Sequence, residues 1–230
     1  MAANVSVVLQ PAVHLSYDQK LRPYHRTIAK LASTYAPPGA RLLDIGCGIG
    51  HLPSAIHDAR PDIELTAADL DAICLERTAA RVPGIETRVI DLSSPSWADF
   101  DDTFDVITLS HVLEHMISPD ETIRDVLGLL APAGHAVIAV PNPSRPDVTL
   151  SNIVRRDYAN RGHVYAWDPS HWRNFLERIV QCDVVEYSAD FVKLFPVRLS
   201  DRVPLLATVE RAAARIVPWW SFSNIAVVAR

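Results

Sequence analysis

The fold of this chain is decided by one stretch, Leu42-Leu43-Asp44-Ile45-Gly46-Cys47-Gly48-Ile49-Gly50-His51-Leu52. Its apolar start has the length of a buried parallel strand. Three glycines within five residues then allow a tight reversal, which brings the backbone close to a ligand. A helix is expected directly after the turn, and its first N–H groups would point at the same ligand. The stretch therefore predicts a nucleotide-like cofactor at the end of a strand.

The spacing of the glycines separates the classes of cofactor. A dinucleotide fingerprint has the pattern G-x-G-x-x-G, whereas here the third glycine comes one residue early and His51 stands in its place. A P-loop needs a lysine after its last glycine, and no lysine occurs between Lys30 and Lys193. What remains is Asp-x-Gly-x-Gly-x-Gly, from Asp44 to Gly50. This pattern resembles the first motif of the class I S-adenosylmethionine (SAM)-dependent methyltransferases.

Acidic residues end the next two predicted strands as well. The second strand, residues 63–68, is followed by Asp69, which lies 23 residues after Gly46 and suits an acceptor for ribose hydroxyls. The third, residues 85–90, is followed by Asp91, where the resemblance implies an acceptor for the adenine amino group. Capping of the next turn is the alternative role for Asp91. The cofactor contacts that we predict are Asp44, Gly46, Cys47, Gly48, Gly50, Asp69, Leu70, Asp91, Leu92 and Ser110.

Composition and charge narrow the class of protein further. With 49% hydrophobic and 21% charged residues, the 230-residue chain can bury a full core as one domain. A net charge of −5 without a basic stripe makes nucleic acid an unexpected partner. Three widely spaced cysteines indicate reduced thiols. We find no secretory signal and no transmembrane segment of ~18 apolar residues, so we expect a cytoplasmic protein.

The order of predicted elements indicates an α/β protein with a doubly wound, Rossmann-like sheet. Helices are expected at residues 17–35, 52–59, 71–81, 121–130, 169–180 and 205–216. Further strands are expected at residues 104–109, 136–140, 183–187 and 225–229. The resemblance implies seven strands flanked by helices, mostly parallel with the last strand antiparallel. The placement of the final two strands rests on the resemblance alone.

Two segments of the single domain, residues 1–230, are expected to cover the site. Residues 1–38 form an N-terminal helical cap, in which Tyr17, Tyr24 and His25 either close over the cofactor or anchor a helix on the sheet edge. Residues 144–162 are polar and arginine-rich, and we interpret them as an insertion that forms a lid over the acceptor site. Arginines in and beside this segment either bind a phosphate or carboxylate of the acceptor or form a solvated loop: Arg145, Arg155, Arg156 and Arg161.

A second group of functional residues follows the fourth strand, in Ser110-His111-Val112-Leu113-Glu114-His115. Loops at the carboxyl ends of parallel strands line the ligand crevice. In a helical turn, residues at i, i+3 and i+4 share a face, so His111, Glu114 and His115 would converge. Two imidazoles and one carboxylate make a plausible site for a divalent metal.

The resemblance extends to this group. It is strongest to the branch that includes ubiquinone-pathway O-methyltransferases and small-RNA terminal 2′-O-methyltransferases, which have Glu-x-x-Glu-His here. It implies His163 as a further metal ligand from a downstream loop. This chain has His111 where those relatives have Glu. Three imidazoles and one carboxylate favour Zn, Mn, Fe or Co over Mg. The alternatives are a metal-free catalytic base and a purely structural role.

The predicted function is SAM-dependent O-methyl transfer to the hydroxyl of a small acceptor, either a phenolic ring or a sugar. His111, Glu114 and His115 are the predicted catalytic residues, acting with a divalent metal or as a base. The alternatives are a metal-free N- or C-methyltransferase for small molecules and a non-catalytic SAM-binding module. The sequence leaves a homodimer possible and does not identify the acceptor.

Overall fold

The structure is a computed structural model that describes residues 21–93, 100, 102–154, 162–195 and 197–230. Tyr17, Arg155, Arg156 and Arg161 lie outside the described residues. Within the described residues, every helix is too short or too polar to cross a lipid bilayer.

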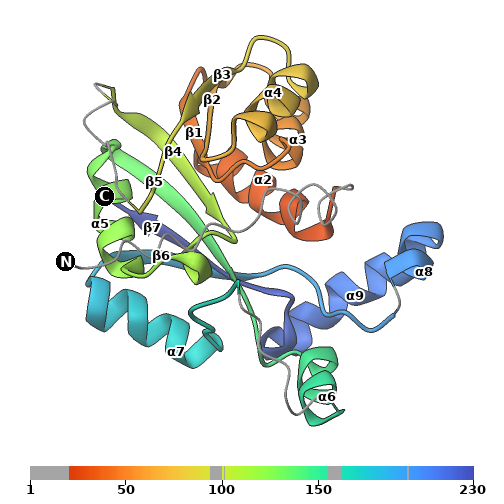
Figure 1. Cartoon of the computed structure of the whole chain (residues 1–230). Helices are drawn as coiled ribbons and strands as arrows, with labels where there is room; N and C mark the ends of the chain where they lie inside the picture. Colours follow the sequence, from red (N-terminus) through yellow and green to blue (C-terminus); the bar gives the residue numbers. More distant parts are fainter. Residues whose placement is uncertain (1–20, 94–99, 101, 155–161, 196) are drawn as a thin grey trace.

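Seven strands form one sheet in the order β3-β2-β1-β4-β5-β7-β6 (Figure 1). Their bounds are β1 Arg41–Ile45, β2 Glu64–Asp69, β3 Glu86–Val89, β4 Phe104–Ser110, β5 Leu130–Pro141, β6 Asp183–Ala189 and β7 Ser223–Ala229. The first five strands are parallel, and β7 runs antiparallel to both of its neighbours, β5 and β6. The predicted fold class, including the antiparallel last strand, is confirmed.

Helices cover both faces of this sheet (Figure 1). Successive strand residues point to opposite faces, so Leu42 packs with the residues of α2 and Leu43 packs with those of α5 and α7. The helices are α2 Pro23–Tyr35, α3 His51–Ala59, α4 Ala72–Arg81, α5 Pro119–Gly128, α6 Pro146–Val154, α7 Pro169–Asn174, the π-helical continuation η3 Phe175–Val180, α8 Val197–Arg202 and α9 Pro204–Ile216. Single 3₁₀ turns are η2 Leu113–His115 and η4 Pro218–Trp220.

The boundary between α5 and β5 differs from the sequence prediction. The helix expected to reach Leu130 ends at Gly128, and Leu130 instead begins β5, where it pairs with Phe104. Residues 132–134, which lie between the helix and the strand predicted from the sequence, are inside this long strand, because a register shift opposite Phe104 and Val106 accommodates them. Ala133 has φ 65° at this irregularity. The proline and glycine there therefore mark a bulge and not the start of a strand.

Segments at one end of the molecule extend beyond the sheet. Figure 1 shows α6 and the pair α8 and α9 projecting from the end of the sheet where β5 stops. Of the predicted lid, residues 144–154 and 162 are described, and α6 buries none of its residues. A lid over the site stays a prediction.

Candidate active site

The glycine turn directly follows β1, as predicted. Gly46, Gly48 and Gly50 have φ values of 73°, 52° and 81°, which L side chains rarely adopt. A Cβ on Gly46 would overlap the Val112 side chain, and one on Gly50 would lie 2.8 Å from Thr78 Oγ1. These contacts show why the turn has no side chains at these positions. They also place Val112, between His111 and Leu113, directly against the turn.

Asp69 connects the glycine turn to the end of β2. Its Oδ2 accepts the N–H of Gly48 at 2.9 Å, and its Oδ1 accepts the N–H of Asp71 at 3.0 Å. Each oxygen keeps a lone pair for another donor, since a carboxylate oxygen accepts two hydrogen bonds. Leu70, the next residue, is exposed. The position fits the predicted ribose acceptor, and that role stays a prediction.

The remaining predicted cofactor residues lie around the same turn. Asp91 Oδ1 accepts hydrogen bonds from the backbone and hydroxyl of Ser93, at 2.9 and 2.6 Å, so the turn-capping role is confirmed. Its contact with adenine stays a prediction. Leu92 packs on the edge of the main core. Ser110 ends β4, and its buried hydroxyl has no hydrogen-bond partner among the described residues. Burial raises the pKa of the Cys47 thiol, which is consistent with packing and not with nucleophilic chemistry.

Asp44 is buried beneath the turn. Its Oδ1 accepts the hydroxyl of Thr108 at 2.5 Å, and its Oδ2 has no partner among the described residues. Burial raises the pKa of the Asp44 carboxyl to about 7, against the effect of the Thr108 hydrogen bond, and the nearby Asp69 charge adds to the shift. A cationic ligand above the turn would favour the ionised form.

His111, Glu114 and His115 come together, although not by the predicted helical face. The local helix is the single 3₁₀ turn η2, and His111 lies before it with φ 57°. Nevertheless, Glu114 Oε1 lies 3.6 Å from His111 Nδ1 and 3.9 Å from His115 Nε2. The prediction of convergence was right for these three side chains, and its structural reason was wrong.

His163 joins the group from the loop before α7. The backbone carbonyl of Glu114 accepts the N–H of Val164 at 2.7 Å, and His115 Nδ1 bonds to the carbonyl of Gly162 at 2.5 Å. The rings of His115 and His163 are 4.9 Å apart. One ligand atom from each of Glu114, His115 and His163 lies within 4.8 Å of the others, which suits a metal ion. His111 is not in this compact set.

The electrostatics of Glu114 fit a cation. Its side chain is buried, and its Oε2 has no hydrogen-bond partner among the described residues. Burial raises the pKa of Glu114 to about 8, and a cation bound beside the carboxyl would favour its ionised form. Burial also lowers the pKa of His163 to about 4, with the neighbouring His115 adding to the effect, which leaves a neutral imidazole. Neutral imidazoles beside a buried carboxyl are the donor set that divalent transition metals prefer.

His111 is held by residues that the sequence did not reveal. Its Nε2 bonds to Ser223 Oγ at 3.0 Å, across 112 residues of sequence. The buried Asp190 Oδ1 in turn accepts the N–H groups of Phe191, Phe222 and Ser223. No local pattern could connect these segments, because the pairing depends on how β6 and β7 lie in the sheet.

The N-terminal helix reaches the same place. The Tyr24 ring lies 4.6 Å from the His111 ring and stacks on Phe222 at 5.7 Å. His25 is buried, and its Nδ1 accepts the N–H of Arg22 at 3.0 Å. Tyr24 therefore contacts a predicted site residue, while His25 has the packing role. Contact with a cofactor stays a prediction for both.

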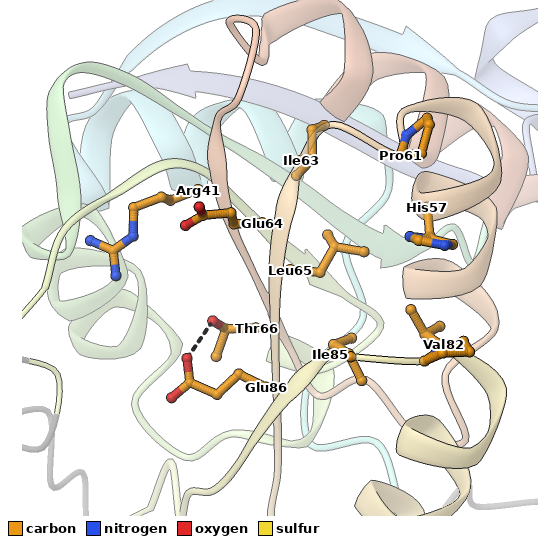
Figure 2. Close-up of a pocket in the computed structure, with 12 residues that line it drawn as sticks. Arg41, His57, Pro61, Ile63, Glu64, Leu65, Thr66, Val82, Ile85 and Glu86 are labelled. Atoms are coloured by element: carbon orange, nitrogen blue, oxygen red, sulfur yellow. Dashed lines mark hydrogen bonds between the residues drawn. The ribbon is translucent and has the colours of Figure 1, made fainter.

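A separate hollow of about 320 Å³ lies at the other end of the strands (Figure 2). It is lined by the amino ends of β1, β2 and β3 and by the loop after α4, and Thr66 Oγ1 donates to Glu86 Oε2 there at 3.3 Å. Ligands of open parallel sheets bind outside the carboxyl ends of the strands. This hollow is therefore distinct from the predicted active site.

Comparison with known proteins identifies the family. A family model described as a methyltransferase domain matches residues 17–186, which is most of the chain. The chain belongs to the SAM-dependent methyltransferases. The predicted resemblance is confirmed.

Individual relatives refine the comparison. The chain is 31% identical over 152 residues to the ubiquinone biosynthesis O-methyltransferase of Xanthomonas campestris pv. campestris (strain B100), covering 64% of this chain and 61% of that protein. It is 32% identical over 145 residues to the enzyme of that name from Caulobacter sp. (strain K31), covering 60% and 54%. The match thus spans less than two thirds of these curated relatives.

Solved structures share the fold. A Haloferax volcanii methyltransferase, solved in complex with the Trm112 methyltransferase activator, matches with a TM-score of 0.67 at 18% identity, covering 95% of this chain and 96% of that chain. The N-methyltransferase NodS from Bradyrhizobium japonicum WM9, in complex with S-adenosyl-L-homocysteine, matches with a TM-score of 0.61 at 16% identity, covering 97% and 93%. Matches at such low identity support the fold and not a particular acceptor.

Proposed function

We propose that this protein transfers a methyl group from SAM to the hydroxyl of a small acceptor. The observation that carries the proposal is the buried Glu114 carboxyl between His111 and His115, on a loop that touches the glycine turn through Val112. The loop follows β4, and the carboxyl ends of parallel strands are where open α/β sheets bind their ligands, which supports a place beside SAM. A hydroxyl bound there would be adjacent to the transferred methyl group.

The chemistry explains why an oxygen acceptor needs these side chains. A protonated hydroxyl is a weak nucleophile, and even a phenol has a pKa of about 10. Methyl transfer requires the oxygen to lie in line with the S–CH₃ bond, and correct positioning supplies a large part of the rate. In this proposal His111 orients the hydroxyl, and the contacts of its ring with Ser223 and Tyr24 support that role. Glu114 and His115 lie next to it.

We further propose that Glu114, His115 and His163 hold one divalent metal ion, with His111 as a fourth ligand or as a base. His115 Nδ1 bonds to the backbone carbonyl of Gly162, and a metal-binding histidine usually makes such a contact through its second ring nitrogen. When bound, such an ion lowers the pKa of a hydroxyl and orients it. The ligand set favours Zn, Mn, Fe or Co over Mg.

For the acceptor, we favour a phenolic compound over a sugar. The support is the name shared by the curated relatives at 31–32% identity, ubiquinone biosynthesis O-methyltransferase. We do not propose nucleic acid as the acceptor, because the chain has a net charge of −5 and would repel a phosphate backbone. We also propose that the protein acts in the cytoplasm.

We propose that residues 144–162, together with the N-terminal cap, close over the acceptor as a lid. The described α6 has no buried residue to hold it against the core. Hydrogen exchange in α6 should be fast in the free protein and slower with SAM and acceptor bound. Equal, strong protection in both states would contradict a lid.

The test of the main proposal is conversion of SAM to S-adenosylhomocysteine with a panel of phenols, sugars and amines. Mass spectrometry of the products should locate the methyl group on oxygen. A chelator should suppress the reaction, and Zn²⁺, Mn²⁺ or Co²⁺ should restore it. Activity unaffected by chelator would remove the metal and leave His111 as a base. Methylation of nitrogen or carbon alone would contradict the proposed reaction.

A further inference from the structure

Three large apolar side chains of the helix α9 face solvent. Leu205, Val209 and Ile216 share one face at helical spacing, and they are 68%, 42% and 81% exposed. The opposite face is buried and contains Glu210, which is 3% exposed. An amphipathic helix ordinarily packs its apolar stripe on the core. In α9, these three residues are exposed, while Leu206 is partly buried and Ala214 is buried on the side of Glu210.

Specific hydrogen bonds fix this orientation of α9. Glu210 Oε1 accepts the N–H groups of Leu194 and Phe195, both at 3.0 Å. The backbone carbonyl of Glu210 accepts the N–H of Val192 at 3.1 Å. A buried carboxylate with two backbone donors is costly to move, because its partners would lose their bonds. The hydrogen bonds of Glu210 therefore hold the apolar stripe of α9 toward solvent.

The apolar surface continues past the helix. Pro218–Trp220 form the turn η4, where Trp219 is 52% and Trp220 45% exposed. We call the set Leu205, Val209, Ile216, Trp219 and Trp220 the α9 face. Tryptophan is enriched where a protein meets the headgroup region of a membrane, because its ring is apolar and its N–H is polar.

The exposed charges of α9 have one sign. Within α9 the charged residues are Glu210, Arg211 and Arg215, and α8 before it ends with two residues of opposite charge, Asp201 and Arg202. Arg211 and Arg215 are exposed, whereas Glu210 is buried. The whole chain, in contrast, has a net charge of −5. A helix with an apolar stripe, arginines beside the stripe and tryptophans directly after it has the composition of a helix that lies in a membrane interface.

We propose that the α9 face docks on the surface of a lipid bilayer that contains anionic lipids. The 13-residue helix is too short to span the ~20 residues that crossing requires, so it would lie along the surface. Pairing with a second copy is disfavoured, because a two-fold interface sets the same patch against itself and would oppose the arginines. The anionic headgroups supply the complementary charge.

The docked surface would lie near the acceptor side of the site. The segment that Glu210 holds begins next to Phe191, whose ring stacks on Phe222 at 5.1 Å. Phe222 in turn stacks on Tyr24, which contacts His111. The proposal does not depend on the reaction, because lipid binding is measured without turnover.

Vesicle flotation tests the proposal with the full chain. The protein should float with vesicles of phosphatidylcholine and phosphatidylglycerol and remain unbound with phosphatidylcholine alone. Two variants, L205Q/V209Q/I216Q and R211E/R215E, should each reduce the bound fraction at least about tenfold. The matched control is Ile179→Gln, which changes a 55% exposed isoleucine on η3 and should bind as the unchanged protein does. SAM affinity should stay the same in all variants, which shows that they are folded.

Three results would overturn the proposal. One is no flotation of the unchanged protein with the anionic vesicles. Another is equal flotation of the unchanged protein and both variants. The third is a dimer, seen by light scattering without lipid, that L205Q/V209Q/I216Q converts to a monomer, because a second copy would then be the occupant of the α9 face.

Discussion

Gly48 and Asp69 are joined by a hydrogen bond of 2.9 Å, from the glycine N–H to the carboxylate Oδ2. The bond ties the glycine turn after β1 to the end of β2. One residue therefore fixes the shape of the cofactor turn and is also the predicted ribose acceptor. Changes at Asp69 should affect both.

Asp69→Ala should weaken SAM binding by about 1.5–3 kcal/mol, the usual value of a hydrogen bond to a charged group. Calorimetry measures the affinity, and thermal unfolding measures the loss of the Gly48 bond. The matched control is Asp62→Ala, because Asp62 Oδ2 also accepts a glycine N–H, that of Gly39 at 3.1 Å, away from the site. The control should leave SAM affinity unchanged. Unchanged affinity in folded Asp69→Ala would reject the ribose role.

Gly50→Ala should abolish measurable SAM binding and lower stability. Gly50 has φ 81°, and an added Cβ would lie 2.9 Å from the Thr78 backbone. Gly84 is the matched control, since its φ is 82° and an added Cβ would meet nothing within 4 Å. Gly84→Ala should therefore cost only about 1–2 kcal/mol of unfolding free energy for the left-handed backbone. Equal effects of the two changes would mean that crowding at the turn is unimportant.

The glycine turn and the strand-ending acids were predictable because their signals are local. Asp44 is next to the last residue of the first predicted strand, and Asp69 and Asp91 directly follow the strands predicted at residues 63–68 and 85–90. The left-handed backbone at His111 carried no such signal, so a helical face was expected in place of one 3₁₀ turn. The convergence of its side chain with Glu114 still occurred, because both follow β4 closely.

Long-range features could not be predicted in this way. The bond between His111 and Ser223 needs β7 to lie beside β5, and that order was known only from the resemblance. The orientation of α9 runs against hydrophobic patterning, because the two N–H groups that bind Glu210 belong to a segment with no signal of its own. A sequence pattern shows which residues share a helix face, and only packing shows which face is buried.

Asp44 should make stability depend on pH. The pKa of Asp44 is about 7 in the folded protein, compared with the ordinary value of 3.8 that applies to the unfolded chain. Between these two pH values the folded chain therefore holds a proton that the unfolded chain has lost. The free energy of unfolding should therefore fall as pH rises, by at most about 1.4 kcal/mol per pH unit from this group. Above pH ~7 the contribution should be constant.

Asp44→Asn removes this titration and keeps an oxygen for Thr108. Chemical denaturation of both proteins from pH 5 to 8 measures the difference in unfolding free energy. The unchanged protein should lose stability relative to the variant as pH rises to about 7, and the difference should then level off. A difference that is constant over the whole range would show that Asp44 is ionised in the folded protein.

Glu114→Gln should remove the metal site while leaving SAM binding nearly intact. Glu114 is the only acid in the compact set with His115 and His163, so its charge contributes most to holding a cation. The purified protein should contain about one divalent ion per chain by elemental analysis, and the variant should contain little. His171→Ala is the control, because His171 is an exposed imidazole paired with Asp168 on α7.

His111→Glu tests whether His111 is the fourth ligand. A second carboxylate would make the ligand set harder, so activity restored after chelation should shift from Zn²⁺ or Co²⁺ toward Mg²⁺, which prefers oxygen. The change also removes the bond to Ser223 Oγ, and unaltered SAM affinity would show that the turn is intact. If His111 is instead a base, the variant should lose activity with every metal. Full activity of Glu114→Gln and no bound metal in the unchanged protein would reject the metal site altogether.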